Sequence, residues 1–278
     1  MHISILGCGA MGGALLRGLK HDAGNVLSVF DRNPEKAVEA STGAKAKVTI
    51  SSDVASAVKD AEVVLLVIKP QGIAEILQET AAFAPEAALF ISCAAGVSLS
   101  TLEEAAPGTP VARCMPNTGS ALGKGTTGIF FGGTSIVDEE LPRAKQVLSA
   151  LGEVHLLPNE DAFHAMTALC GSGPAYFLLA IEAMVDEGVR LGMKREQAAV
   201  YARGALRAAS ALLDDDAAGE ALGATTLRSH ITSPGGTTIA GLMAMEAEGR
   251  TAFKGAVRAA ERRSREMHAG RSSSDFVE

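Results

Sequence analysis

The chain has 278 residues, of which 47% are hydrophobic and 21% are charged, and its formal net charge is −7. This balance is typical of a globular protein that is long enough for one large domain or two ordinary ones. The acidic charge argues against nucleic acid as a partner, because phosphate binding needs a basic face. Four scattered cysteines without a CxxC pair predict reduced thiols and no metal site.

The sequence contains no run of about 18 or more consecutive apolar residues, so we expect no membrane-spanning helix and no membrane partner. The first residues, MHISIL, lead directly into a strand-like run without the basic start and cleavage site of a signal peptide. We therefore expect a cytoplasmic protein.

Residues 1–157 alternate short β-branched runs with helical patterns. The apolar runs predict strands at 2–6, 26–30, 46–50, 62–68, 88–92, 111–115, 128–132 and 153–157. Helices are predicted between most of them, at 10–21, 34–40, 52–58, 71–83, 100–105 and 138–151. Continuous apolar strands such as VVLLVI indicate a parallel sheet that is buried between two helical layers. The alternation predicts an α/β fold, with an N-terminal Rossmann-like doubly wound sheet in residues 1–157.

From residue 158 onward the strand signals stop and helical spacing takes over. Helices are predicted at 161–191, 195–213, 219–229, 237–248 and 252–267. The longest of them has apolar positions on more than one face, which indicates burial. About 120 residues offer few partners for that burial. We therefore expect residues 158–278 to form an all-α C-terminal dimerisation domain, and the protein to be a homodimer.

The segment SILGCGAMGG places Gly7, Gly9 and Gly12 in G-x-G-x-x-G spacing, between a predicted strand and a predicted helix. In that context Gly7 makes the tight turn and Gly9 lets the backbone approach a pyrophosphate. Gly12 permits close packing of the helix on the strand. The motif predicts a dinucleotide site formed by Gly7, Cys8, Gly9, Ala10, Met11 and Gly12.

The choice of dinucleotide depends on the end of the second predicted strand. Asp31 follows that strand 24 residues after Gly7 (31 − 7), near the usual place of the acid that reads the ribose, which favours NADH. Arg32 and Asn33 can instead hold the 2′-phosphate of NADPH, with the Asp31 side chain turned away, so both cofactors stay open. Other strand ends meet the same edge of the sheet and add candidate cofactor contacts. These are Ile68, Lys69, Pro70, Ala94, Ala95 and Asn117.

The stretch TSPGGTTIAGL interrupts the helical half with an unusual concentration of turn-forming residues. Ser233 can act as a cap, Gly235 and Gly236 allow an unusual backbone path, and Thr237 and Thr238 begin the next helix. Free amides at a helix N-terminus, together with hydroxyls, form an anion site without arginine. The alternative is a Pro-Gly turn followed by a capped helix.

The segment GSGPAY, residues 171–176, falls inside the longest predicted helix. Pro174 removes a backbone amide and is expected to kink that helix, while Gly171 and Gly173 permit close approach of another backbone. A packing kink at the dimer interface and a wall of the substrate pocket both fit this pattern, and the two are compatible.

Six segments, in this order and spacing, resemble the pyrroline-5-carboxylate reductase family: ILGCGAMGGALLRGL, VIKPQ, SCAAGVSL, RCMPNT, CGSGPAYFLLAIEAMVDEGVRLGM and TSPGGTTIAGL. The resemblance covers nearly the whole chain, and GSGPAY and SPGGTT are its most specific motifs. It implies reduction of 1-pyrroline-5-carboxylate to L-proline with NADPH or NADH, the last step of proline biosynthesis. One departure is Gly119–Ser120, because the family usually has proline after MPNT, and a looser loop is expected there.

The resemblance also implies how the site is assembled. The active site would form between the Rossmann-like domain of one subunit and helices of its dimer partner, and dimers would assemble further, often into decamers. Thr238 is the expected catalytic residue, with its hydroxyl near the ring nitrogen of the substrate. Glu160 can place a carboxylate near the amine of proline, although acids are common at helix starts. The expected substrate-binding set is Ser233, Gly235, Gly236, Thr237, Thr238 and Glu160.

Two rival functions are compatible with parts of the pattern. A β-hydroxyacid dehydrogenase or related imine reductase typically carries a catalytic lysine on the long central helix, and residues 161–190 contain no lysine. A non-catalytic nucleotide sensor with a Rossmann fold would keep the glycine loop but would not need SPGGTT.

Overall fold

The structure, a computed structural model, describes residues 1–132, 134–215 and 223–269. The chain divides into two compact units. Unit 1 comprises Met1–Gly171 together with the chain from Ala260 onward, and unit 2 comprises Ser172–Ala259. The boundary predicted after residue 157 therefore differs from the division into compact units, which leaves the first helical turns after the sheet in unit 1.

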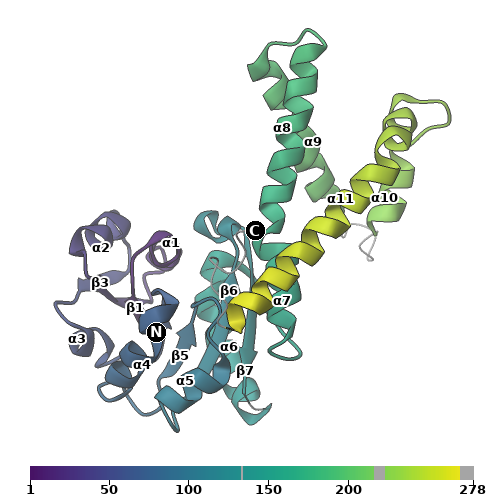
Figure 1. Cartoon of the computed structure of the whole chain (residues 1–278). Helices are drawn as coiled ribbons and strands as arrows, with labels where there is room; N and C mark the ends of the chain where they lie inside the picture. Colours follow the sequence, from purple (N-terminus) through teal and green to yellow (C-terminus); the bar gives the residue numbers. More distant parts are fainter. Residues whose placement is uncertain (133, 216–222, 270–278) are drawn as a thin grey trace. The chain divides into compact units, whose positions relative to one another are not determined.

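Unit 1 is built on one eight-stranded sheet with the order β3-β2-β1-β4-β5-β6-β7-β8 (Figure 1). All neighbouring strands are parallel except β6 and β7, which are antiparallel. β1 pairs with both β2 and β4, so the strand order reverses at β1, as in Rossmann-like folds. This order confirms the predicted fold class. The strands are β1 (His2–Leu6), β2 (Val26–Phe30), β3 (Lys47–Ile50), β4 (Val63–Leu66), β5 (Leu89–Ser92), β6 (Val111–Pro116), β7 (Gly125–Phe131) and β8 (Gly152–Leu156).

Helices cover both faces of this sheet, which explains why its central strands are apolar throughout. On β4, Val63 and Leu65 belong to the core cluster that includes residues of α1, α2 and α6. Val64 and Leu66 belong to the opposite cluster, with residues of α3, α4 and α5. The helices are α1 (Ala10–Leu19), α2 (Pro34–Ser41), α3 (Val54–Val58), α4 (Ile73–Ala81), α5 (Leu99–Ala105) and α6 (Thr134–Leu148), with 3-10 turns η1 (Pro70–Gly72), η2 (Thr118–Leu122) and η3 (Ser149–Leu151).

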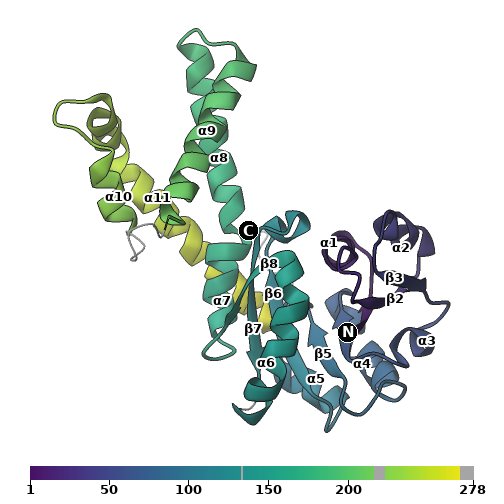
Figure 2. The same ribbon diagram turned by 180° about the vertical axis from the view of Figure 1, so that it is seen from behind.

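The described residues after β8 include helices and no strand, as predicted for an all-α C-terminal region. In unit 2, α8 and α9 run side by side (Figures 1 and 2), and Val185, Ala198 and Ala202 are buried between them. The elements are α7 (Ala162–Met166), the π-helical turn η4 (Thr167–Gly171), α8 (Gly173–Arg190), α9 (Arg195–Leu213), α10 (Ala224–His230) and α11 (Thr237–His268). Part of the helix predicted at 219–229 lies outside the described residues.

The two helices predicted at 237–248 and 252–267 are one continuous helix, α11, so this division was wrong. Gly249 lies in the gap between the two predicted helices, but a single glycine weakens a helix by only about 1 kcal/mol. Two hydrogen bonds, each between residues one helical turn apart, cross the expected gap. Arg250 pairs with Glu246, and the Thr251 hydroxyl donates to the carbonyl of Ala247 at 2.9 Å.

The expectation of a kink at Pro174 was also wrong, because the helix is interrupted before it reaches the proline. The backbone makes the π-helical turn η4, and α8 then starts at Gly173 with Pro174 in its first turn. A proline in that position loses no helical hydrogen bond, since the first amides of a helix have no partner within it.

One helical stretch of the described chain, Ala162–Arg190, is long and apolar enough to cross a membrane by length and composition alone. The expectation of no such stretch rested on uninterrupted apolar runs. Glycine, serine and threonine interrupt the run here while the mean hydropathy stays at 1.5. Only 17% of the most apolar window is buried within the chain, and Phe177, Leu178 and Leu179 are more than half exposed.

Candidate functional site

The glycine loop between β1 and α1 has the geometry that its spacing predicts. Gly7 has a φ of 100°, and a Cβ at this position would lie 2.4 Å from the carbonyl oxygen of Val67. A Cβ on Gly12 would lie 1.8 Å from the carbonyl oxygen of Gly7. Both positions therefore require glycine for the fold itself. Gly9 differs, because a Cβ there would meet no atom within 4 Å, so the fold leaves open space at this residue.

The space beside Gly9 belongs to a cavity that suits a pyrophosphate. Gly9 is the N-cap of α1 and supplies no side-chain hydrogen bond to the helix start. The positive end of the helix dipole and the first amides therefore stay available for an anion. The cavity measures about 350 Å³ and is lined by Cys8, Gly9, Ala10, Gly13, Arg17, Lys36, Glu39 and Ala40. Its two cations add to the attraction for a phosphorylated ligand.

The carboxylate of Asp31 turns toward the glycine loop. One oxygen accepts a hydrogen bond from the amide of Cys8 at 2.6 Å, and the other accepts from the amide of Asn33 at 2.8 Å. The side chain of Asn33 caps α2 by accepting from the amide of Glu35 at 3.1 Å. Arg32 is exposed between them. The two anchored side chains stabilise the loop, and Arg32 is free to meet a ligand.

The remaining cofactor candidates follow β4 and β5 at the same edge of the sheet. Ile68 and Lys69 end the β4 segment, and Lys69 precedes Pro70 at the start of η1. Ala94 is buried and Ala95 is exposed, and the amide of Ala94 donates to the Ser92 hydroxyl at 3.3 Å. Residues that follow β4 and residues that follow β5 line one cavity of about 330 Å³. It is lined by Pro70, Gln71, Ile73, Ala74, Glu75, Gly96, Val97, Ser98, Thr101 and His268.

Asn117 follows β6 and organises the loop behind it. Its Oδ1 accepts from the amides of Gly119 at 3.1 Å and Thr126 at 3.3 Å, and its Nδ2 donates to the carbonyl of Cys170 at 3.3 Å. A proline at position 119 could not donate that hydrogen bond. A Cβ on Gly119 would also lie 2.6 Å from the carbonyl oxygen of Lys124. The departure at Gly119 thus contributes a hydrogen bond and close packing to this loop, contrary to the looser loop expected from the sequence.

The four cysteines are free thiols, and two of them are buried. Burial, with the nearby carboxylate of Asp31, raises the pKa of Cys8 to about 12. The hydrogen bond with Cys93, with Sγ atoms 3.2 Å apart, and complete burial raise the pKa of Cys114 far above its ordinary value. Cys8 and Cys114 are therefore protonated near neutral pH and serve as small core side chains.

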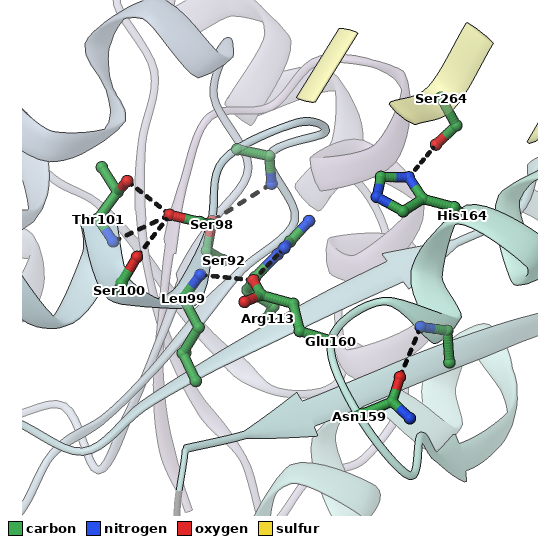
Figure 3. A network of polar contacts seen from close by, with 12 residues as sticks. Ser92, Ser98, Leu99, Ser100, Thr101, Arg113, Asn159, Glu160, His164 and Ser264 are labelled. Carbon is green, nitrogen blue, oxygen red and sulfur yellow. Dashed lines mark hydrogen bonds and ion pairs between the residues drawn. The ribbon is translucent and has the colours of Figure 1, made fainter. Parts of the chain in front are cut away.

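Glu160 lies just before α7, and its carboxylate faces the sheet (Figure 3). The same oxygen, Oε1, accepts from Nη1 of Arg113 on β6 and from the amide of Leu99 at the start of α5, the latter at 2.6 Å. The Arg113 side chain is only 7% exposed, and its guanidinium lies 4.6 Å from the ring centroid of Phe163.

The end of α11 is attached to α7 next to this ion pair. Nη2 of Arg265 donates to Asp161 at 2.8 Å. Figure 3 shows the second contact, in which Nδ1 of His164 is 2.9 Å from the hydroxyl of Ser264. The rings of His164 and His268 pack edge to face with centroids 5.4 Å apart. Burial and the neighbouring guanidinium of Arg265 lower the pKa of His164, so the neutral imidazole is favoured here.

The turn before α11 explains why residue 235 is glycine. The amide of Gly236 donates to the carbonyl of Ser233 at 3.1 Å, with Pro234 and Gly235 between them, and Gly235 has a φ of 69°. This is a type II turn, which requires a positive φ at its third residue. A Cβ on Gly236 would lie 2.4 Å from the hydroxyl oxygen of Ser233. The described hydrogen bonds include no cap by the Ser233 hydroxyl, and the Ser233 carbonyl closes the turn.

The first turn of α11 and the loop before it are accessible. Ser233, Gly235, Thr237 and Thr238 are exposed, and Gly236 is half-buried. Ser233 and Pro234 also line a cavity of about 620 Å³ within unit 2. Its other lining residues are Thr225, Arg228, Ser229, Thr232, Ile239, Leu242, Met243 and Glu246. Thr237 and Thr238 lie outside this lining, at the helix N-terminus, where free amides attract an anion.

Sequence reasoning missed several residues that shape these sites. Arg113 stands inside an otherwise apolar strand, and a charged residue there requires a buried partner, which is a signal that the sequence did contain. Arg17 and Lys36 lie on helix surfaces, where cations are common, so nothing in the sequence set them apart. Arg228 and Glu246, which are 3.3 Å apart, come from different helices.

Comparisons with known proteins agree along the whole chain. Residues 160–267 match a family model for pyrroline-5-carboxylate reductase dimerisation, and residues 2–96 match one for NADP oxidoreductases that are coenzyme F420-dependent. The pyrroline-5-carboxylate reductase of Mycobacterium tuberculosis is 36% identical over 95% of this chain and 96% of its own. The Pseudomonas aeruginosa reductase is 34% identical with the same coverage. The structure of the Coxiella burnetii reductase matches with a TM-score of 0.84 and 28% identity, over 95% of this chain and 97% of that one.

Proposed function

The chain belongs to the pyrroline-5-carboxylate reductase family, and we propose that it reduces 1-pyrroline-5-carboxylate to L-proline, the last step of proline biosynthesis. It is an NAD(P)H-dependent oxidoreductase by the same relationship. The observation that carries the proposal is the combination of two features in one chain. An open glycine loop precedes α1, and an exposed helix N-terminus follows the Ser-Pro-Gly-Gly turn.

The glycine loop would hold the cofactor. Gly9 leaves space for the pyrophosphate, and the amides of Ala10 and Met11 at the start of α1 point their partial positive charge at it. Lys69, Ala95 and the other candidates after β4, β5 and β6 would border the nicotinamide end. When bound, the cofactor supplies the hydride, and the chain contributes orientation and electrostatics.

The residues that follow β2 favour NADPH as the cofactor. The classical NADH arrangement needs the acid to accept hydrogen bonds from the ribose hydroxyls, whereas both oxygens of Asp31 accept from backbone amides. Arg32 is exposed beside them, and Arg17 and Lys36 line the adjoining cavity. A 2′-phosphate would thus meet cations, and a planar guanidinium is well suited to bind it.

The Ser233–Thr238 segment would hold the substrate. The carboxylate of 1-pyrroline-5-carboxylate would accept hydrogen bonds from the amides of Thr237 and Thr238 in the first turn of α11, with the hydroxyls of Ser233 and Thr237 beside them. The Thr238 hydroxyl would lie at the ring nitrogen and keep it protonated. A protonated imine is already a good electrophile, so the reaction needs no metal and no strong nucleophile from the chain.

The rival functions receive less support. The described α8 contains no lysine, which a β-hydroxyacid dehydrogenase would place on its central helix. A nucleotide sensor would have no use for an exposed helix N-terminus preceded by the Ser-Pro-Gly-Gly turn. Binding of NADPH without turnover of any imine acid would nevertheless favour the sensor.

We also propose that the protein is a homodimer that assembles further into a decamer, in the cytoplasm. Unit 2 exposes large apolar side chains on α8, α9 and α11, and soluble proteins cover such surfaces with a partner. Among them are Phe177, Leu178, Leu179, Met184, Val200, Tyr201, Met243 and Met245. The family match to a dimerisation region covers these helices. In this arrangement the Ser233–Thr238 segment of one subunit serves the cofactor of its partner.

The functional boundary is best placed near residue 158, with a cofactor domain at 1–157 and a dimerisation and substrate domain at 158–278. The dimerisation match starts at residue 160 and supports this division. The compact units divide at Gly171 because α7 is attached to the sheet through Glu160 and Arg113.

Steady-state kinetics with 1-pyrroline-5-carboxylate and both NADH and NADPH tests substrate and cofactor together. We expect turnover with both cofactors and a higher kcat/KM with NADPH. Proline-dependent reduction of NADP⁺ at alkaline pH should report the reverse reaction. Failure to reduce the imine acid with either cofactor would contradict the proposed function. Light scattering on the purified protein measures the oligomeric state, and a monomer would contradict the dimer.

A further inference from the structure

Two segments at the proposed nicotinamide end depend on one carboxylate from outside the sheet. The Ala94–Ser98 loop joins β5 to α5, and residues 115–117 follow Arg113 toward the end of β6. Glu160 contacts the residue next to each segment: Leu99, 61 residues before it, follows the first, and Arg113, 47 residues before it, precedes the second (Figure 3). Its carboxylate is 30% exposed, while the guanidinium that it neutralises is buried.

The Ala94–Ser98 loop is held at both ends, and Glu160 provides one of these attachments. At the start, the Ser92 hydroxyl accepts from the amide of Ala94 at 3.3 Å. At the end, Ser98 caps α5 by accepting from the amide of Thr101 at 3.1 Å. The next amide, that of Leu99, is an orphan donor of the helix start, and Glu160 accepts from it at 2.6 Å.

The β6 attachment involves charge as well as geometry. Arg113 is paired in register with Ser92 on β5, so its side chain leaves the sheet where the loop begins. Among the described residues, Glu160 is the only carboxylate paired with Arg113. A buried guanidinium without a counter-charge would draw in water or move toward solvent. Loss of Glu160 would therefore release the end of β6 and the start of α5 together.

We propose that Glu160 is a positioning residue for hydride transfer, which holds the Ala94–Ser98 loop against the end of β6, and that it does not bind the substrate amine. This inference rests on the proposed function, because it takes Ala94, Ala95 and Asn117 as neighbours of the nicotinamide. The single oxygen Oε1 serves both attachments, so a movement of the carboxylate toward a substrate would release both of them at once.

The test compares Glu160→Ala, which removes both attachments, with Glu160→Gln, which keeps an acceptor for Leu99 but loses the charge. Glu104→Gln, an exposed acid on the same helix α5, is the matched control. NADPH affinity is measured by fluorescence titration without substrate. The kcat, the KM for 1-pyrroline-5-carboxylate and the isotope effect with deuterated NADPH follow from steady-state rates. Melting temperatures show which variants are folded.

For Glu160→Ala we expect NADPH binding to weaken about tenfold and kcat to fall with it, because misplacement by a fraction of an ångström slows hydride transfer. The KM for the imine acid should stay within about twofold, and the isotope effect should rise. Glu160→Gln should be intermediate and Glu104→Gln unchanged. If Glu160→Ala does not fold, Glu160→Gln decides alone.

Two results would overturn the inference. A higher KM for the imine acid with unchanged NADPH affinity would mean that Glu160 contacts substrate. A lower melting temperature with unchanged NADPH affinity and kinetics would mean that the ion pair is structural only. The cofactor titration does not depend on the substrate. If the wild-type protein fails to reduce 1-pyrroline-5-carboxylate, the proposed function fails while the titration still tests Glu160.

Discussion

Replacing Gly12 by alanine should destabilise the fold without any ligand present. The added Cβ would lie 1.8 Å from the carbonyl oxygen of Gly7 and 2.8 Å from the carbonyl carbon, where real contacts stay beyond 3.0 Å. Both atoms belong to the backbone, so α1 and the Gly7 turn must separate by roughly 1 Å. Overpacking costs about 1–3 kcal/mol, and a backbone clash belongs at the upper end. At about 3 kcal/mol the Tm should fall by about 6–12 °C.

Gly9→Ala is the matched control, because it adds the same methyl group three residues away. Its Cβ would meet no atom within 4 Å, and Gly9 has a φ of −63°, which alanine adopts readily. The free energy of unfolding should change by less than about 0.5 kcal/mol. NADPH affinity should nevertheless fall at least about tenfold, because the methyl group occupies the approach of the pyrophosphate.

The assays are differential scanning fluorimetry for the Tm and fluorescence titration for NADPH. An unchanged Tm for Gly12→Ala would refute the steric argument for the helix–strand contact. Wild-type NADPH affinity for Gly9→Ala would refute the proposed path of the pyrophosphate, whatever happens at Gly12. The two variants thus separate a glycine that the fold needs from one that the ligand needs.

Four other outcomes are expected. Thr238→Ala should lower kcat at least about tenfold, and Thr238→Ser should recover it. A folded Thr238→Ala variant with the wild-type kcat would exclude a catalytic role for the hydroxyl. Arg32→Ala should lower kcat/KM for NADPH about tenfold and leave that for NADH unchanged. Burial lowers the pKa of His164 below its ordinary 6.5. The stability that the neutral imidazole contributes is therefore complete above pH 6.5 and is lost as the pH falls. The Tm of His164→Asn should drop less on acidification than that of the wild-type protein. Iodoacetamide at pH 8 should leave Cys8 and Cys114 unmodified by mass spectrometry, since burial raises the pKa of Cys8, and the hydrogen bond with Cys93 together with burial raises the pKa of Cys114.

Local patterns were sufficient to predict the sheet and the glycine loop. Apolar runs bounded by turn residues identify strands directly, and the bounds of β1 and β2 are those predicted. The roles of Gly7 and Gly12 follow from spacing, because strand, turn and helix are neighbours in the chain. The features that predicted the fold class therefore lie within a few residues of one another.

Contacts between distant parts of the chain could not be predicted in this way. The pairing of Glu160 with Arg113 joins residues 47 apart, and an acid before a helix has an ordinary local explanation. The continuity of α11 depends on Glu246 and Thr251, whose contacts offset the weakness at Gly249. The close approach of the Ser233 hydroxyl to Gly236 is a contact that no sequence pattern specifies.

The division of the chain has a consequence for its synthesis. Unit 2 is inserted into unit 1, because the chain leaves unit 1 at Gly171 and returns to it at Ala260. Where the chain returns, hydrogen bonds of Asp161 with Arg265 and of His164 with Ser264 attach the end of α11 to unit 1. Most of the sheet emerges from the ribosome first, yet the N-terminal unit is completed last, when residues 260–268 have been made. A nascent chain therefore carries an unfinished α7 surface throughout translation of unit 2.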